Sequence, residues 1–157
     1  MNTLYASLRQ QFIAKHGGDC IHINGWLVFS DGATMDRNPA GALAEPPTDP
    51  YERWKIVARY REELLRRATD QFTEANRELR SRAHVAMRDG LPPPNREEID
   101  KLKELQQTVK RCQQRYAAAR EQMKRTTPEW MRGRDETAAH NRESNSRVLD
   151  ELKRIQI

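Results

Sequence analysis

The side chains best suited to metal binding or nucleophilic chemistry are few and widely spaced in this 157-residue chain. The four histidines are His16, His22, His84 and His140, and the two cysteines are Cys20 and Cys112. No two histidines stand four residues apart, and no Cys-x-x-Cys occurs. Cys20 and His22 would share one face of a strand, but two ligands cannot complete the four-ligand set of a structural zinc site. We therefore expect no metal site and no cofactor.

Carboxylates and glycines give no catalytic pattern either. The pairs Glu62-Glu63 and Glu97-Glu98 fall on expected exposed helix faces or in a helix cap. Gly17-Gly18 precedes an expected strand, whereas a phosphate-binding loop opens a helix. Ser30 lies in the turn-like stretch Ser30-Asp31-Gly32. We expect no catalytic residues, no enzyme activity and no small-molecule substrate.

Positive charge is the chemical property that the chain concentrates. The formal net charge is +5 and the sequence pI is about 9.5. Residues 1–49 hold 3 basic and 5 acidic residues, residues 50–127 hold 19 and 12, and residues 128–157 hold 6 of each. The middle segment thus carries a net charge of +7. Whether this charge forms a surface depends on how the segment folds.

The first 48 residues predict a small α+β unit. Apolar residues at four-residue steps indicate a helix over 3–16, which Gly17-Gly18 would end. Two apolar runs, 20–23 and 26–29, flank Asn24-Gly25, whose residues tolerate the positive φ of a hairpin turn. A third short strand over 33–35 and a linker or wrapped loop over 36–49 would complete this unit.

Two long helices are predicted between residues 49 and 126. The stretch 49–52 combines an N-cap aspartate, a proline at the first helical position and a glutamate at N3. Gly90 and the prolines 92–94 should end this helix, and Asn95 repeats the capping signal. Apolar residues over 99–123 then recur at a mean spacing close to that of a coiled-coil seam. The short connection should fold the two helices back as an antiparallel hairpin.

The two ends of this hairpin differ in charge. Pairing about the connection would bring together residues whose numbers sum to about 185. The base, residues 53–67 with 110–125, holds 12 basic and 3 acidic residues, whereas the distal half, 68–109, holds 7 and 8. A basic patch of this kind suits nucleic-acid phosphates or an acidic partner. The candidate contact residues are Arg53, Lys55, Arg59, Arg66, Arg67, Lys110, Arg111, Arg115, Arg120, Lys124 and Arg125.

Aromatic residues and prolines add two further candidate features. Trp26, Trp54 and Trp130 fall near the predicted base, where a small shared core is favoured over stacking on nucleic-acid bases. The distal connection is rigid and apolar, which suits protein contact, although prolines there also serve to stop a helix. The candidate tip contacts are Leu91, Pro92, Pro93 and Pro94.

Together these signals predict a mainly α protein built on a long, coiled-coil-like antiparallel helical hairpin. Residues 1–48 form a small N-terminal α+β base with a β-hairpin, 49–126 the helical hairpin, and 127–157 a helical tail ending in a short amphipathic helix over 148–155. Only 36% of the residues are hydrophobic and 32% are charged, which favours an elongated shape. With no apolar membrane span and no signal peptide in the sequence, we expect a cytoplasmic protein with no membrane contact.

The function predicted from these features is non-catalytic. A two-helix rod cannot surround its own seam, so Tyr60, Leu64 and Ala118 are expected to be exposed and to need a protein partner or self-association. The main hypothesis is an adaptor or structural subunit of a larger assembly that acts through protein contacts of the hairpin. The alternative is a nucleic-acid-binding accessory protein that uses the arginine-rich base.

Overall fold

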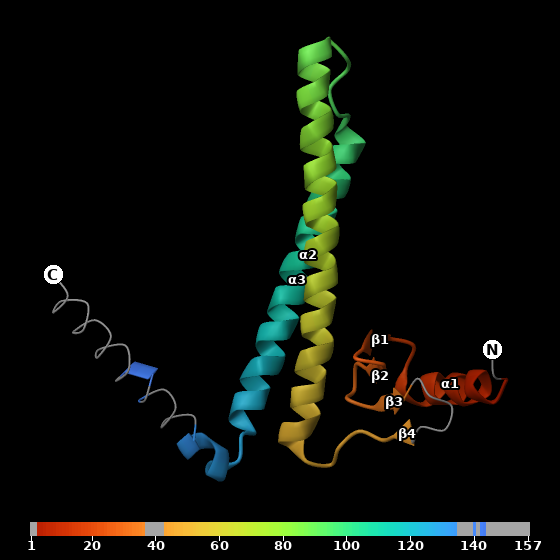
Figure 1. Cartoon of the computed structure of the whole chain (residues 1–157), viewed down its shortest axis with the longest axis vertical. Coiled ribbons are helices and arrows are strands. Elements are labelled where there is room, and N and C mark those ends of the chain that lie inside the picture. Colours follow the sequence, from red (N-terminus) through yellow and green to blue (C-terminus); the bar gives the residue numbers. More distant parts are fainter. Residues whose placement is uncertain (1–2, 37–42, 135–139, 141, 144–157) are drawn as a thin grey trace, which may run out of the picture.

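The computed structural model describes residues 3–36, 43–134, 140, 142 and 143 (Figure 1). Its elements are α1 (Thr3–His16), β1 (Cys20–Ile23), β2 (Trp26–Phe29), β3 (Thr34–Asp36), β4 (Leu43–Ala44), α2 (Pro50–Asp89) and α3 (Arg96–Arg125). The predicted fold class is confirmed, because two long helices pack against each other and a small antiparallel sheet lies at the N-terminal end. Residues 129–134 are also helical. The helix predicted over 148–155 lies outside the described residues.

The sheet has the strand order β1-β2-β3-β4, with every neighbouring pair antiparallel. Asn24 and Gly25 turn the first hairpin with φ of 49° and 84°, as their types predict. The third strand begins at Thr34, one residue later than expected. The segment expected to be only a linker or loop contributes β4, in which Leu43 is the register partner of Met35.

The sheet lies between two helices because its strands alternate apolar residues between opposite faces. Leu27, Phe29 and Met35 form one core with Phe12 of α1. The rings of Phe12 and Phe29 lie 5.1 Å apart in an edge-on arrangement. Ile21 and Val28, which are paired across β1 and β2, form a second core with Tyr60 on the base of α2.

The predicted signals at the ends of the two long helices are all present. Asp49 accepts a hydrogen bond from the backbone N–H of Glu52, and Gly90 ends α2 in the left-handed conformation with φ of 66°. Asn95 and Glu98 form a reciprocal capping box at the start of α3. These local interactions explain why the bounds of both helices were predictable.

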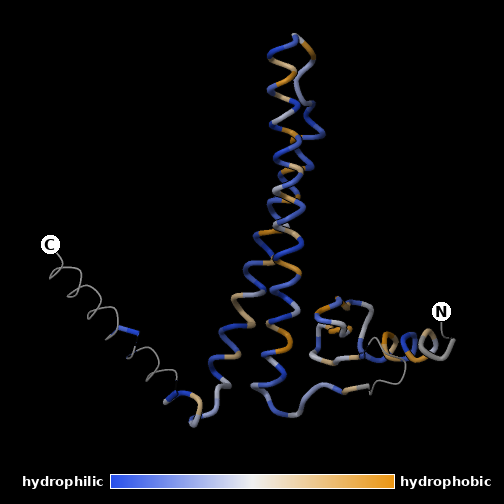
Figure 2. Tube along the Cα trace, in the orientation of Figure 1, coloured by the Kyte–Doolittle hydropathy of each residue, from blue (hydrophilic) through white to orange (hydrophobic). Residues whose placement is uncertain are grey.

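Small residues dominate the buried part of the contact between α2 and α3. Ala58 and Ala119 are buried with Val57 in the core cluster that joins the two helices, and Ala68 and Ala86 are buried farther along α2. Figure 2 shows a rod that is largely hydrophilic, with hydrophobic residues at separated positions. The hairpin therefore buries little apolar surface over most of its length.

The register of the hairpin differs from the predicted one. The guanidinium of Arg61 donates to the carbonyl of Arg115, Tyr116 donates to Glu62, and Arg82 pairs with Glu98, so contacting residue numbers sum to 176–180. The connection runs back beside α2 instead of turning symmetrically, and α3 begins below the end of α2 (Figure 1). Extended proline-rich chain covers about 3.1 Å per residue against 1.5 Å in a helix, which accounts for the offset.

Candidate functional site at the hairpin base

Ion pairing divides the rod into two regions. In the distal half, the basic residues that pair with carboxylates are Arg77, Arg82, Arg88, Arg96, Lys101 and Lys103, which leaves only Arg80 unpaired with the described residues. In the base, only Lys55, Arg66, Arg67 and Arg125 do so. The basic residues of the base that have no carboxylate partner among the described residues are Arg53, Arg59, Arg61, Lys110, Arg111, Arg115, Arg120 and Lys124. The excess charge of the base is thus mostly unneutralised.

Glu63 forms ion pairs with the two arginines that follow it on α2, and Arg66 also pairs with Asp70. Arg66 donates two hydrogen bonds to this carboxylate, at 2.6 and 2.9 Å, and Arg67 donates one at 3.0 Å. These bonds, chiefly those from Arg66, lower the pKa of Glu63 to about 2. Arg66 and Arg67 were predicted contact residues, but their guanidiniums already have a carboxylate partner.

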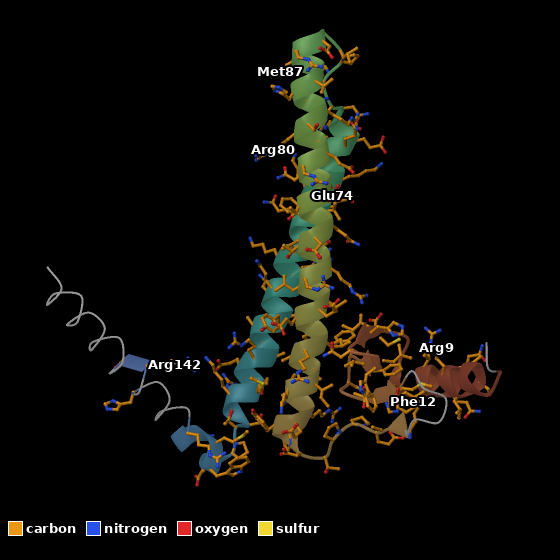
Figure 3. The ribbon with its side chains drawn as sticks, in the orientation of Figure 1. Arg9, Phe12, Glu74, Arg80, Met87 and Arg142 are labelled. Atoms are coloured by element: carbon orange, nitrogen blue, oxygen red, sulfur yellow. The ribbon has the colours of Figure 1, made fainter. Side chains whose placement is uncertain are left out.

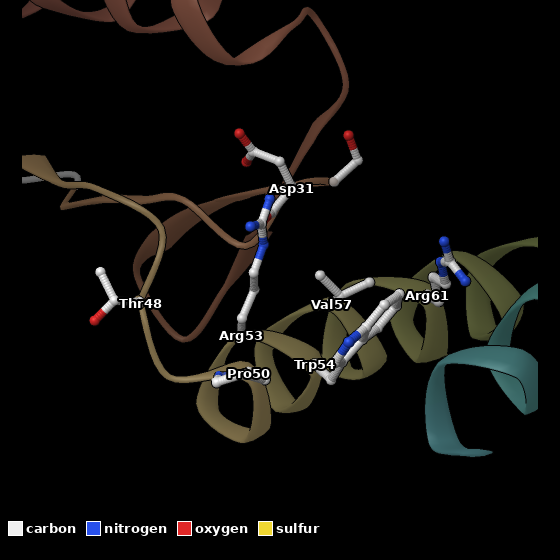
Figure 4. Close-up of a pocket in the computed structure, with 8 residues that line it drawn as sticks. Asp31, Thr48, Pro50, Arg53, Trp54, Val57 and Arg61 are labelled. Atoms are coloured by element: carbon white, nitrogen blue, oxygen red, sulfur yellow. The ribbon is translucent and has the colours of Figure 1, made fainter. Parts of the chain in front are cut away.

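A cavity of about 300 Å³ opens between the β2–β3 turn and the start of α2 (Figure 4). Arg53, Trp54 and Arg61 line it from α2, and Ser30, Asp31 and Thr48 line it from the preceding segments. The Asp31 carboxylate is engaged by the backbone N–H of Ala33 at 3.0 Å and by His16 Nδ1 at 2.8 Å. Burial raises the pKa of Asp31, but these two hydrogen bonds outweigh it, so the net pKa lies below the ordinary value.

Both arginines of this cavity are held by backbone carbonyls. Arg53 Nε donates to the carbonyl of Asp31 at 3.0 Å, and Arg61 Nη1 donates to that of Arg115 at 2.9 Å. Gly32 makes room for Arg53, because a Cβ there would lie 3.2 Å from Arg53 Cγ. Its φ of 94° also favours glycine. The two guanidiniums are therefore positioned without being neutralised.

A second hollow of the base is lined by basic and aromatic residues, among them Arg59 and Tyr116. Tyr116 donates from its hydroxyl to Glu62 at 3.2 Å, and the Arg120 guanidinium lies 5.9 Å from the centre of the Tyr116 ring. Burial, followed by the charge of Glu62, raises the pKa of Tyr116. Arg59 lies nearby and borders the same hollow as Tyr116.

The three tryptophans do not share a core. Trp54 is half-buried and packs against the Val57, Ala58 and Ala119 cluster. Trp26 is 40% exposed and Trp130 is 65% exposed, with Arg134 stacked 5.8 Å from the Trp130 ring. The expected tryptophan core is therefore wrong for two of its three members.

Tyr60 and Leu64 are not exposed, contrary to the prediction. Tyr60 is 5% exposed and is covered by Ile21 and Val28 of the sheet, and Leu64 packs against the same cluster. Ala118 is exposed, as expected. Because the N-terminal sheet covers the base of α2, this part of the rod does not need another protein to bury its apolar side chains.

The predicted tip contacts project from the far end of the rod. Leu91, Pro92 and Pro93 are exposed and Pro94 is half-buried. Met87, on the last turns of α2, is 87% exposed (Figure 3). Gly90 already ends α2 before the first proline, and the N–H of Leu91 bonds to the carbonyl of Ala86. The prolines are therefore not required as a helix stop.

Sequence reasoning missed the environment of His16. Its side chain is only 6% exposed and lies between Asp31, at 2.8 Å, and Glu45, at 3.2 Å. Its ring also packs 4.4 Å from that of Phe12. The three polar residues come from distant parts of the sequence, so no local pattern could reveal them. In the described part of the chain, no three His, Cys, Asp or Glu side chains are placed to share a metal ion.

Comparison of the chain with protein-family models, with curated proteins and with solved structures gives no match. Over the described ranges, no helix combines the length and apolar character needed to cross a bilayer.

Proposed function

We propose that this chain is a non-catalytic accessory protein that binds nucleic acid through the base of its helical hairpin. The observation that carries the proposal is the contrast in ion pairing along the rod. Most distal cations are neutralised by neighbouring carboxylates, whereas eight cations of the base are not. Unpaired arginines can bind phosphates without first breaking an internal ion pair, and guanidinium suits bidentate phosphate contact.

Two matched triple variants test this proposal. Replacing Arg59, Arg115 and Arg120 by glutamine removes three cations that lack a carboxylate partner. Replacing Arg66, Arg67 and Arg125 by glutamine removes the same charge from ion-paired residues. Binding of a labelled 25-nucleotide RNA would be measured by fluorescence anisotropy at several salt concentrations, with circular dichroism as the folding control.

The first variant should bind more weakly than the second, and the slope of log K against log salt should fall by about 2, since each lost single-strand contact contributes about 0.7. Equal losses in the two variants would contradict the role of the unpaired residues. Absence of salt-dependent binding by the unmodified chain would refute the function itself.

One observation favours the alternative function of a protein-binding adaptor, namely the exposed tip of the hairpin. Three consecutive prolines beyond the helix stop favour an extended polyproline conformation, because each fixes its own φ and restricts the residue before it. Aromatic-lined grooves of partner proteins bind such segments. Exchange of Met87 and Leu91 for serine should abolish capture of a protein partner while RNA binding is retained. Capture of the same proteins by this variant would leave the tip without a docking role.

A further inference from the structure

The cavity beside Trp54 brings together an aromatic side chain and two arginines in one place on the base. Its volume of about 300 Å³ is at the small end of the range for ligand pockets. Its lining includes the Trp54 ring, the guanidiniums of Arg53 and Arg61, and the Asp31 carboxylate (Figure 4). The ring and the guanidiniums match one unit of a single-stranded nucleic acid, which offers a flat base and an anionic phosphate.

We infer that this cavity binds a single unpaired nucleotide of the nucleic acid, with its base against Trp54 and its phosphate on one of the two flanking guanidiniums, that of Arg53 or that of Arg61. The inference rests on the proposed function and assigns a defined pocket to it. Base stacking on tryptophan tolerates any sequence, because every base has a π face. The pocket therefore favours single strands over duplexes.

The two guanidiniums are ready for phosphate binding. Each guanidinium donates one hydrogen bond to a backbone carbonyl, at 3.0 Å for Arg53 and 2.9 Å for Arg61. A guanidinium has five N–H donors, so donors remain for a ligand on both side chains. The nearby Asp31 carboxylate does not compete for them, because its hydrogen bonds are to His16 and the Ala33 N–H.

The neighbouring helix extends the pocket into a path for the strand. Arg61 lines the cavity and donates to the backbone carbonyl of Arg115, which places this edge of the cavity beside that turn of α3. Arg111 and Arg115 are four residues apart and so project from the same side of the helix. Neither has a carboxylate partner among the described residues. The next phosphates of a bound strand would meet these two arginines.

Binding of a fluorescein-labelled 12-nucleotide oligouridylate to the full chain tests the inference. The pocket variant replaces Arg53 and Arg61 by glutamine, and its matched control replaces Arg66 and Arg67. A second pair compares Trp54→Leu, which removes the stacking surface, with Trp54→Phe, which keeps an aromatic ring in the Val57 and Ala119 cluster. A 12-base-pair duplex and a phosphoserine peptide serve as competitors.

The pocket variant should lose at least tenfold more affinity than its control. Trp54→Leu should weaken binding about 5- to 150-fold, the range expected for one stacked base, while Trp54→Phe retains most of it. The duplex should compete poorly with the single strand.

Equal losses for the pocket variant and its control would overturn the pocket and leave the general nucleic-acid function in place. No binding of the oligonucleotide by the unmodified chain would overturn both. Stronger binding of the phosphoserine peptide, with the same dependence on Arg53 and Arg61, would reassign the pocket to a phosphorylated protein.

Discussion

Tyr60 connects the sheet to the rod, and its truncation should uncouple them. The side chain is 5% exposed and packs against Ile21 and Val28. Removal of a buried aromatic side chain typically costs about 3–5 kcal/mol. With a urea m-value of about 1–3 kcal/mol per molar for a small protein, Tyr60→Ala should lower the unfolding midpoint by about 1 M or more.

Tyr60→Phe is the matched control, because it removes only the hydroxyl and keeps the ring that packs against Ile21 and Val28. We expect a change within about 0.5 kcal/mol near neutral pH. Burial, followed by the charge of Asp19, raises the pKa of Tyr60 above its ordinary value of 10.0. The stability that the neutral phenol confers is therefore present below pH 10 and is lost as the pH rises further, and Tyr60→Phe should remove this loss.

Urea unfolding followed by far-ultraviolet circular dichroism and by tryptophan fluorescence measures both effects. The two probes should separate in Tyr60→Ala if the sheet detaches before the rod unfolds. An unchanged midpoint in Tyr60→Ala would refute the packing described for the sheet. It would instead fit a tyrosine exposed for a partner protein.

Three further changes test other parts of the fold. Ala119 is fully buried against Val57 and Ala58, so Ala119→Leu should overpack the helix crossing and cost about 1–3 kcal/mol in urea unfolding. Gly90→Ala places a Cβ in a left-handed residue with φ of 66°, which should cost about 1–2 kcal/mol in thermal unfolding. The lowered pKa of Glu63, about 2 against 4.5, should give about 1 kcal/mol of stability after allowance for solvent screening. That contribution is present above pH 4.5 and lost as the pH falls toward 2, so Glu63→Gln should flatten acid unfolding in this range.

The sequence predicted those parts of the fold that short-range interactions determine. Asp49 and Asn95 cap their helices through residues three positions away, and Asn24-Gly25 needs only its own backbone angles. The bounds of α1, β1, β2, α2 and α3 follow from such signals. They could be read correctly because no distant contact is needed to specify them.

Long-range packing accounts for what the sequence did not reveal. An apolar stripe on α2 does not say whether a sheet or another protein covers it, so Tyr60 was assigned to the wrong environment. The register between α2 and α3 depended on the path of the proline-containing connection. The formation of β4 depended on pairing between Met35 and Leu43. For the candidate site, charge counts identified the base. They could not show that Arg66 and Arg67 both pair with Glu63, or that Arg61 and Trp54 line the same cavity.

The sheet contacts α2 only near the start of the helix, so the sheet supports the rod at one end. From Leu64 to Asp89, 25 residues of α2 continue beyond the sheet, a length of about 38 Å. A tilt of about 5° where the sheet holds the helix would move the tip by about 3 Å over that length. Arg53 and Trp54 lie at the supported end of α2, where they line the cavity. A ligand that tilted this end of α2 would therefore displace Leu91 farther than it displaced the start of the helix.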